Sequence, residues 1–318
     1  MCDPGGSTPY EGAKRLHLAE KSGQVAGFLR SSRPGPAGGL QDGRRAREFV
    51  LIRAVDGSRL DGVEQWGDLD VVIAGTTHVG RIRKVNQDSF DRFDDPDRGE
   101  ILLVVADGMG GHRGGETASR MAVGTLGKLC REREGDAESR LRAAIERANF
   151  EIHKLAGKDH TLKGMGTTIV ALLLRRDGPA LVAHVGDSRL YRLRDKVLTP
   201  LTEDHSIVTL LLRNGSITPE EAHDHPKRNQ IMRAVGVHDD VEIDVAPVKP
   251  RAGDAYLLCS DGISAMLRDP DIETIVNRAP DPHTAVAWLI DAANQAGGMD
   301  NITTLIALVV EPTGGSPS

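Results

Sequence analysis

The sequence of 318 residues contains few aromatic side chains and few cysteines. Phe, Trp and Tyr make up 3% of the chain, so the hydrophobic core must be built from Val, Leu, Ile and Ala. The three cysteines are Cys2, Cys130 and Cys259, a scattered set without a CxxC spacing. This pattern favours reduced thiols in a cytoplasmic protein, and it argues against a zinc site.

Long apolar segments are also missing from the chain. The run IVALLL at residues 169–174 is far shorter than the roughly 20 residues that a membrane-spanning helix needs. The N-terminal sequence MCDPGGSTPYEG lacks the basic and apolar regions of a signal peptide. A net charge of −6 at pH 7 argues against a general nucleic-acid binder. We therefore expect a cytoplasmic, monomeric globular protein with neither a membrane nor a nucleic acid as partner.

The composition changes near residue 69. Residues 1–68 include the segment SSRPGPAGGLQDGRR, which is rich in Gly, Pro and Arg and predicts a low-complexity, flexible N-terminal extension. Within it, residues 47–55 have the pattern of a strand that could dock on the main domain, and a mobile tail is the alternative. Residues 69–312 are expected to form one large domain, and residues 313–318 a short tail.

Segments rich in β-branched residues and bounded by turn residues predict eight strands. These strands are expected at 69–77, 101–107, 166–176, 180–187, 189–195, 241–248, 254–261 and 301–311. Amphipathic spacing predicts helices at about 115–132 and 136–156. Two Asp-Pro pairs predict the starts of two further helices, with Asp269 and Asp281 as their N-caps.

The order of these elements indicates the fold class. A capping box at Thr218–Glu221 predicts another short helix, and Gly297-Gly298 is expected to end the last long helix. Helices and strands come in blocks rather than in alternation, which favours antiparallel sheets over a parallel one. We expect an α+β fold in which two stacked antiparallel β-sheets are flanked by pairs of α-helices, an α-β-β-α sandwich.

Five aspartates lie at the ends of apolar segments. Asp107, Asp187 and Asp261 each end a predicted strand, whereas Asp88 and Asp300 precede apolar segments. A single aspartate in such a position is usually a turn former. Five carboxylates at one edge of a sandwich, however, stay ionised together only when a cation neutralises them. Oxygen ligands without His or Cys favour Mg²⁺ or Mn²⁺ over zinc.

The residues around these aspartates point to phosphate chemistry. Gly108 has no side chain, so its backbone carbonyl could approach a metal closely. Two divalent ions can activate a water molecule and neutralise a phosphoryl oxygen. Arg83 is the candidate for binding the phosphate, because its planar guanidinium matches phosphate geometry; a solvated surface arginine is the alternative. The chain has neither a GxxxxGK[ST] loop nor a GxSxG elbow, and GMGTT at 164–168 is expected only as a tight entry into a strand.

Eight segments, in order, closely resemble the successive motifs of the PPM family of metal-dependent Ser/Thr protein phosphatases, especially its compact bacterial members. They are THVGRIRKVNQDS, VVADGMGGHRGGETAS, GMGTTIVALL, HVGDSRLYRL, LTEDHS, NQIMRAVG, YLLCSDG and GGMDNIT. The resemblance covers about residues 69–311. It implies two antiparallel sheets with paired helices outside, a metal centre at one end, and a variable flap at about 203–228 beside the active site.

Carried over position by position, the resemblance implies a role for each aspartate. Asp107 matches the carboxylate that bridges two ions, with the carbonyl of Gly108 as a further ligand. Asp261 and Asp300 match ligands of the first ion, and Asp88 matches the partner of the second ion through water.

Two further residues complete the set that the resemblance implies. Asp187 matches the acid that, together with Asp261, holds a weaker third ion in bacterial members, and Arg83 matches the phosphate-binding arginine. The implied cofactors are two Mn²⁺ or Mg²⁺ ions, with a third left open. The implied reaction is direct attack of a metal-bridging water on phosphoserine or phosphothreonine, without a phospho-enzyme. The implied partners are phosphorylated proteins, including the targets of a Ser/Thr kinase and the activation loop of that kinase.

Some positions depart from the family pattern. Gln87 stands where many relatives have glutamate, so the second metal site is expected to be weaker. His112 is expected near the metals, but its place differs from that of the histidine proposed as general acid in eukaryotic members, so this role is left open. His184 is expected in the core, and His223 and His225 on the surface or beside the substrate.

Two alternative functions are left open. One is a stress-response phosphatase of the same superfamily that acts on an anti-sigma-factor antagonist; such enzymes usually carry an upstream sensor domain and lack the phosphate-binding arginine. The other is a catalytically weak phosphoprotein-binding module, whose signature would be the loss of a metal-binding aspartate. Arg83 and all five aspartates are present, so the phosphatase is favoured.

Overall fold

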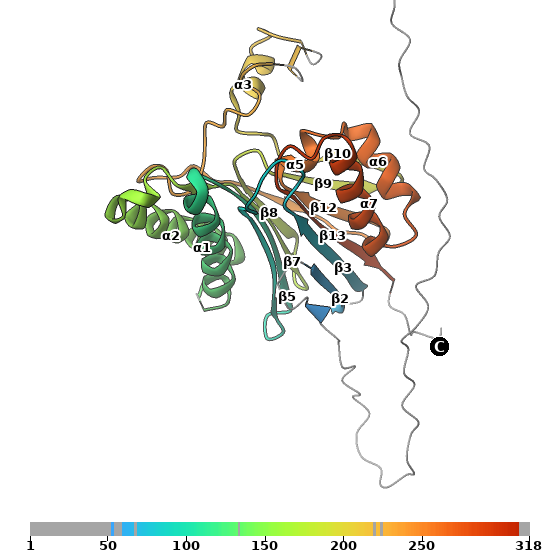
Figure 1. The fold of residues 1–318 in the computed structure, drawn as a ribbon. Coiled ribbons are helices and arrows are strands. Elements are labelled where there is room, and N and C mark those ends of the chain that lie inside the picture. Colours follow the sequence, from blue (N-terminus) through green and yellow to red (C-terminus); the bar gives the residue numbers. More distant parts are fainter. Residues whose placement is uncertain are drawn as a thin grey trace, which may run out of the picture. The chain divides into compact units, whose positions relative to one another are not determined.

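Two antiparallel β-sheets lie face to face at the centre of the fold (Figure 1). The computed structural model describes residues 52–53, 59–66, 69–132, 134–218, 221–222 and 225–311. The first sheet has the strand order β1 (Ile52–Arg53), β2 (Arg59–Trp66), β3 (Leu69–His78), β13 (Ile302–Val310), β12 (Ala255–Cys259), β9 (Arg189–Arg194) and β10 (Val197–Pro200). The second has the order β11 (Asp244–Val248), β8 (Ala180–Val185), β7 (Ile169–Arg175), β5 (Glu100–Met109) and β4 (Asp88–Asp95), with β6 (Gly166–Thr167) paired to β5.

A pair of helices covers the outer face of each sheet. Helices α1 (Gly111–Glu132) and α2 (Ala137–Lys158) lie on the second sheet, and α6 (Asp269–Arg278) and α7 (Pro282–Gln295) lie on the first (Figure 1). The connections contain the short helices α3 (Ile207–Arg213), α5 (Asp261–Ser264) and η1 (His160–Leu162). No helix in these described segments is long and apolar enough to cross a bilayer. The predicted α-β-β-α sandwich of class α+β is confirmed.

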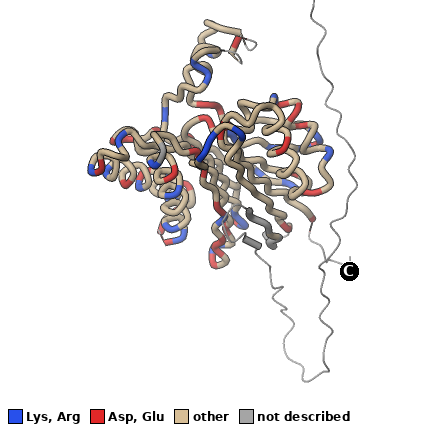
Figure 2. Tube along the Cα trace, viewed as in Figure 1, with Lys and Arg blue, Asp and Glu red and all other residues tan. Residues whose placement is uncertain are grey.

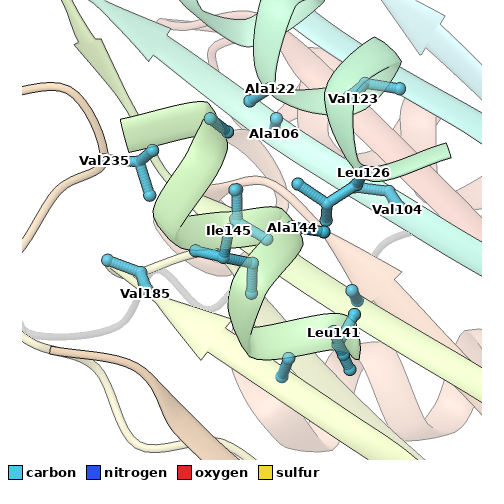
Figure 3. Packing of buried hydrophobic residues seen from close by; sticks show 14 of the residues in the cluster. Val104, Ala106, Ala122, Val123, Leu126, Leu141, Ala144, Ile145, Val185 and Val235 are labelled. Atoms are coloured by element: carbon cyan, nitrogen blue, oxygen red, sulfur yellow. The ribbon is translucent and has the colours of Figure 1, made fainter. Parts of the chain in front are cut away.

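Three clusters of buried aliphatic side chains fill the spaces between the four layers. Figure 3 shows the cluster beneath α1 and α2, where Leu126, Leu141 and Ile145 of the helices lie beside Val104 and Val185 of the strands. Burying an aliphatic side chain of this size stabilises a fold by roughly 1.5–3 kcal/mol relative to its exposure. The sandwich is therefore held together mainly by aliphatic packing, as the low aromatic content predicts.

The described cysteines are buried thiols. Cys130 belongs to the cluster beneath α1 and α2, Cys259 belongs to the cluster beneath α6 and α7, and both are free. Burial raises the pKa of both thiols to about 12. Both therefore stay protonated and unreactive at neutral pH.

Polar residues set the first turns of the long helices. Asp136 and Asp281 cap α2 and α7, because each carboxylate accepts a hydrogen bond from the backbone N–H three residues further on, at 3.0 and 2.8 Å. The prediction that Asp269 caps α6 is wrong, since Arg268 occupies the N-cap position and Asp269 is the first helical residue. The carboxylate of Asp269 instead accepts a hydrogen bond from the Tyr191 hydroxyl at 3.0 Å, which offers it a partner outside its own helix.

Two other predicted helix ends are confirmed. The N–H of Thr218 donates to Glu221 Oε2 at 2.8 Å, and the N–H of Glu221 donates to Thr218 Oγ1 at 3.2 Å, which is the reciprocal pattern of a capping box. Gly297 and Gly298 follow α7 with φ angles of 138° and 56°, a region that glycine adopts readily and other residues rarely.

The first sheet includes residues that precede the expected domain. Strand β2 pairs with β3 in an antiparallel register, and β1 pairs with β2. Residues 52–53 thus belong to the segment for which the sequence left a docked strand open, and the sheet begins before residue 69. Residues 1–51 and 312–318, which hold most of the expected extension and the expected tail, lie outside the described part.

A buried ion pair joins α2 to the second sheet, and removing one partner is expected to destabilise the fold. Arg140 Nη2 donates to both carboxylate oxygens of Glu100, at 2.5 and 2.7 Å, and both side chains are buried. We expect Arg140→Met to lower the free energy of unfolding by about 3–5 kcal/mol, because the buried carboxylate loses the guanidinium that binds both of its oxygens and keeps only Arg175, whose Nε lies 3.6 Å away. Urea unfolding monitored by circular dichroism would measure this.

Arg147→Met is the matched control, because Arg147 pairs with Glu151 on the exposed face of the same helix. It should change the free energy of unfolding by less than about 0.5 kcal/mol. Equal stability of Arg140→Met and the parent protein would contradict the expectation for the buried pair.

Candidate active site

A cavity of about 480 Å³ opens at the edge of the sandwich where the aspartate-bearing strand ends meet. Its lining includes six of the seven residues that the sequence assigns to the site: Arg83, Asp107, Gly108, Asp187, Asp261 and Asp300. The seventh, Asp88, lies opposite Asp107 in the pairing of β4 with β5. The fold thus brings all seven residues to one place.

Strand direction explains this convergence. Asp107 lies near the end of β5, Asp187 follows β8 and Asp261 follows β12, whereas Asp88 begins β4 and Asp300 precedes β13. Because the sheets are antiparallel, the starts of some strands and the ends of others meet at one edge. In Figure 2 acidic residues lie at these strand ends, close to basic residues of the connection between β3 and β4.

Asp88 is fixed by hydroxyl groups from the opposite sheet. Its Oδ2 accepts hydrogen bonds from Ser260 Oγ at 2.8 Å and from Thr303 Oγ1 at 2.6 Å, while its buried Oδ1 has no hydrogen-bond partner among the described residues. Burial raises the pKa of Asp88 to about 7, and the repulsion of Asp261 adds to this, against the two hydrogen bonds, which lower it. Asp88 therefore offers one carboxylate oxygen in a fixed position.

The backbone of Asp107 is held by two threonines of the segment GMGTT. Its N–H donates to Thr168 Oγ1 at 2.9 Å, and its carbonyl accepts from the Thr168 N–H at 2.9 Å and from Thr167 Oγ1 at 2.8 Å. Burial, followed by the repulsion of Asp88, raises the pKa of Asp107 well above its ordinary value. The Asp107 carboxyl group is thus fixed in a buried position, where its ionisation costs free energy.

Gly108 is required by close packing of β5 against α1. A Cβ atom at Gly108 would lie 2.1 Å from the backbone carbonyl oxygen of Gly115, and a Cβ at Gly115 would lie 2.5 Å from the carbonyl oxygen of Gly108. Contact with a turn of α1 is therefore one structural reason for the glycine. The Gly108 carbonyl as a metal ligand stays a prediction.

Asp187 and Asp261 have raised pKa values for the same reasons. Burial raises the pKa of Asp261 to about 6, the repulsion of Asp300 adds to this, and a hydrogen bond with the Asp107 carboxyl group opposes it. Burial and then the charge of Asp261 raise the pKa of Asp187 well above its ordinary value.

Arg83 reaches into the site from the connection between β3 and β4. Its Nη2 donates to Asp300 Oδ2 at 2.8 Å, and about half of the Arg83 side chain is exposed. The arginine is therefore not an isolated surface residue, because its charge is held beside the acids. Its guanidinium has further N–H donors with which to bind a phosphate.

The donor set fits a hard divalent cation. One buried oxygen each of Asp88 and Asp261 lacks a partner among the described residues, and mutual repulsion adds to the raised pKa values of the acids. A cation would relieve both costs, and a donor set of oxygens alone favours Mg²⁺ or Mn²⁺. No three His, Cys, Asp or Glu side chains in the described segments are already arranged as a metal-binding group. The individual ligand assignments therefore stay predictions.

Both ends of the flap are attached to backbone beside these acids. At its start, the N–H of His205 donates to the Gly186 carbonyl at 2.8 Å, and the N–H of Gly186 donates to His205 Nδ1 at 3.1 Å. After its end, Val235 and Thr167 exchange backbone hydrogen bonds of 2.8 and 2.9 Å. The flap thus adjoins Asp187 at one end and the threonines that hold Asp107 at the other.

Sequence reasoning assigned no role to several residues that line the cavity, among them Thr168, Asn229 and Ile231. Thr168 lies beside the backbone of Asp107, and Asn229 and Ile231 come from the chain just beyond the expected flap. Thr168 could have been found from its place after GMG, next to an apolar strand that pairs with β5. The contribution of Asn229 and Ile231 depends on how the flap folds back, which no local pattern indicates.

Gln87 and the described histidines mainly form hydrogen bonds with the backbone or are buried in the core. The Gln87 side chain donates from Nε2 to the backbone carbonyl of the first residue of α1 at 2.6 Å, a bond that a carboxylate could not donate. His184 is buried, as predicted, and burial lowers its pKa to about 4. His225 accepts a hydrogen bond from a backbone N–H two residues away. The side chains of His112 and His223 lie outside the described part of the chain.

Known proteins share this sequence and fold. Residues 74–313 match the sequence profile of the family Protein phosphatase 2C. The chain is 42% identical over 235 residues to the serine/threonine phosphatase stp of Listeria monocytogenes, a match that covers 72% of this chain and 92% of that protein.

Two solved structures are similar to the present one. The serine/threonine phosphatase PstP/Ppp of Mycobacterium tuberculosis superposes with a TM-score of 0.69 at 39% identity, over 76% of this chain and 99% of that one. The catalytic domain of PstP in complex with two manganese ions superposes with a TM-score of 0.66 at 37% identity, over 76% and 99% of the two chains.

Proposed function

Because the chain belongs to the protein phosphatase 2C family, the PPM phosphatases that its motifs resemble, we propose that it hydrolyses phosphoserine and phosphothreonine in proteins. The observation that carries this proposal is the group of aspartates with raised pKa values that lies beside Arg83 at one cavity. The manganese ions of the PstP complex support Mn²⁺ or Mg²⁺ as the cofactor. The phosphatase domain is proposed to comprise residues 69–312 together with β1 and β2, which complete its first sheet.

Each aspartate is proposed to bind particular ions. Asp107 would contact two ions, Asp261 and Asp300 would complete the first ion, and Asp88 would act on the second through its free oxygen or an intervening water. Asp187, with Asp261, would hold a weaker third ion. When bound, divalent ions lower the pKa of a coordinated water towards neutrality and offset the charge of the phosphoryl group.

Arg83 is proposed to bind and orient the phosphate. Its guanidinium lies beside Asp300 and lines the cavity, which supports this role. A bidentate guanidinium fixes the direction of a phosphoryl group as well as offsetting its charge, and such positioning lowers the barrier to attack by water. The open cavity, with a flap at its side, suits an exposed protein loop better than a buried small molecule.

Phosphorylated proteins are the proposed substrates, among them the targets of a Ser/Thr kinase and the activation loop of that kinase. A monomer in the cytoplasm is proposed as the working form. The assigned residues lie in or beside both sheets of one chain, which supports a monomer.

Release of phosphate from a phosphothreonine peptide tests the proposal. With the purified full-length chain, we expect release that depends on added Mn²⁺ and stops on chelation. Asp261→Asn is expected to abolish the release. If the native chain with Mn²⁺ releases no phosphate, while Asp261→Asn binds the phosphopeptide as tightly as the native chain does, the protein is a phosphoprotein-binding module instead.

A further inference from the structure

A second cavity, of about 640 Å³, adjoins the candidate active site. Asp187, Asp261 and Asn229 line both cavities, so the two are adjacent. One wall of the second cavity comes from the flap, including α3, and the other comes from α5 and the start of α6. We call it the flap groove. A peptide whose phosphate lies beside Arg83 could continue along this groove, because the groove starts at the same acids.

A single arginine contacts both acids that line the flap groove beyond the proposed metal-binding set. Arg189 donates from Nε and Nη2 to the two oxygens of Asp204, at 2.8 and 2.7 Å. Its Nη1 also lies 3.7 Å from Asp269, whose Oδ1 accepts a hydrogen bond from Tyr191. Asp204 is therefore bound by both arms of this guanidinium, and Asp269 shares the same guanidinium at longer range.

Two other arginines of the groove have no such partner among the residues that the structure describes. Arg228 comes from the flap and Arg268 from the N-cap position of α6, and both side chains are exposed. None of the ion pairs within the described segments includes either of them. With Asp204 and Asp269 already engaged, two cationic groups from opposite walls are left for a ligand.

We propose that the flap groove is a subsite for a second anionic group of the substrate, a phosphate or a carboxylate on the same peptide as the phosphoresidue that is cleaved. The inference rests on the proposed phosphatase function. A guanidinium binds phosphate and carboxylate oxygens through paired N–H donors, and two guanidinium groups would offset the double charge of a phosphate. The expected preference is for protein segments phosphorylated at two neighbouring residues.

Paired peptides test the preference directly. Each pair carries one hydrolysable phosphothreonine and, one to four residues to either side, a non-hydrolysable phosphonate or an unmodified serine. Only one phosphate can then be released. The rate of phosphate release therefore reports on hydrolysis at the candidate active site alone. We expect kcat/KM to be about tenfold higher with the phosphonate at the best spacing, since one charge-assisted hydrogen bond has about this effect.

Substitution of the arginines should remove this preference. The double variant Arg228→Gln with Arg268→Gln is expected to bring the ratio of the two kcat/KM values close to one, while kcat/KM for the singly phosphorylated peptide stays within about twofold. Arg213→Gln is the matched control, because Arg213 is a flap arginine that pairs with Glu203 and does not line the groove. It should keep the tenfold ratio. A third peptide, with glutamate in place of the phosphonate, shows whether a carboxylate is accepted as well.

Failure of this inference can be told apart from failure of the proposed function. A ratio of one for the native chain at every spacing, or a ratio that the double variant leaves unchanged, would overturn the anion subsite. If no peptide is hydrolysed in the presence of Mn²⁺, the phosphatase proposal fails. Fluorescence anisotropy with peptides that carry phosphonates at both positions would then still test the groove, because tighter binding than that of singly modified peptides needs no turnover.

Discussion

Replacing Asp107 with asparagine is expected to reduce kcat/KM by a factor on the order of 10³ and, in the absence of divalent ions, to raise thermal stability. The activity falls because the predicted bridging carboxylate is lost. The stability rises because burial and the neighbouring acids raise the pKa of Asp107, so at neutral pH its charged form opposes folding. An asparagine of nearly the same size carries no charge. Phosphate release and thermal unfolding in the presence of a chelator measure the two effects.

Asp136→Asn provides the control for this substitution. Asp136 caps α2 at the surface, and asparagine caps helices about as well as aspartate does. Activity and stability should therefore both stay close to those of the parent protein. An Asp107→Asn protein that is active, or that unfolds at a lower temperature than the parent when ions are chelated, would show that Asp107 is not a strained metal ligand.

Removal of divalent ions is expected to abolish activity and to make the folded protein less stable as the pH rises from about 4 to about 7. Burial raises the pKa of Asp88 to about 7 and that of Asp261 to about 6 in the folded state, whereas the unfolded values are near 3.8. A carboxyl group whose pKa is raised in the folded state makes its full contribution to the free energy of unfolding below pH 4, because there it is protonated in the folded and in the unfolded protein. That contribution is lost as the pH rises through the folded-state values, by about 1.4 kcal/mol for each unit of the shift.

Thermal unfolding of the chelated protein at several pH values measures how stability changes with pH. Added Mn²⁺ should reverse the loss of stability at higher pH. At pH 7 added Mn²⁺ is expected to raise the melting temperature, because the ions bind the ionised acids of the folded state alone. At pH 4, where these acids are protonated, the same addition should have little effect. A melting temperature that does not fall between pH 4 and pH 7 after chelation would show that burial and mutual repulsion do not raise the pKa values of these acids.

The layers of the fold and the convergence of the acids could be predicted because both follow from local patterns. An apolar segment that ends in aspartate, as at Asp107 and Asp261, predicts a strand, its direction and its polar end at the same time. Helices α1 and α2 follow from spacing along one face. The resemblance to known phosphatases then places the remaining acids in order.

Other features depend on contacts between distant residues, which no local pattern reveals. Asp269 has the pattern of an N-cap, but Tyr191, far away in sequence, binds its carboxylate, and the helix starts one residue earlier. The hydroxyls of Ser260 and Thr303 fix Asp88 only because β12 and β13 are neighbours in the first sheet. Strand β2 was missed because it lies in a segment of polar composition, where pairing with β3 rather than its own hydrophobicity decides the structure.

The flap is an insertion that is joined to the sandwich at two points, one near each of its ends. Its two attachment points, His205 with Gly186 and Val235 with Thr167, use mainly backbone groups, and neither depends on the residues in between. We therefore expect that mutation can reshape the middle of the flap, and with it the proposed choice of substrate, while the aspartates proposed to bind metal keep their places. Chimeras that exchange this segment between relatives should keep their chemistry and acquire the donor's preferences.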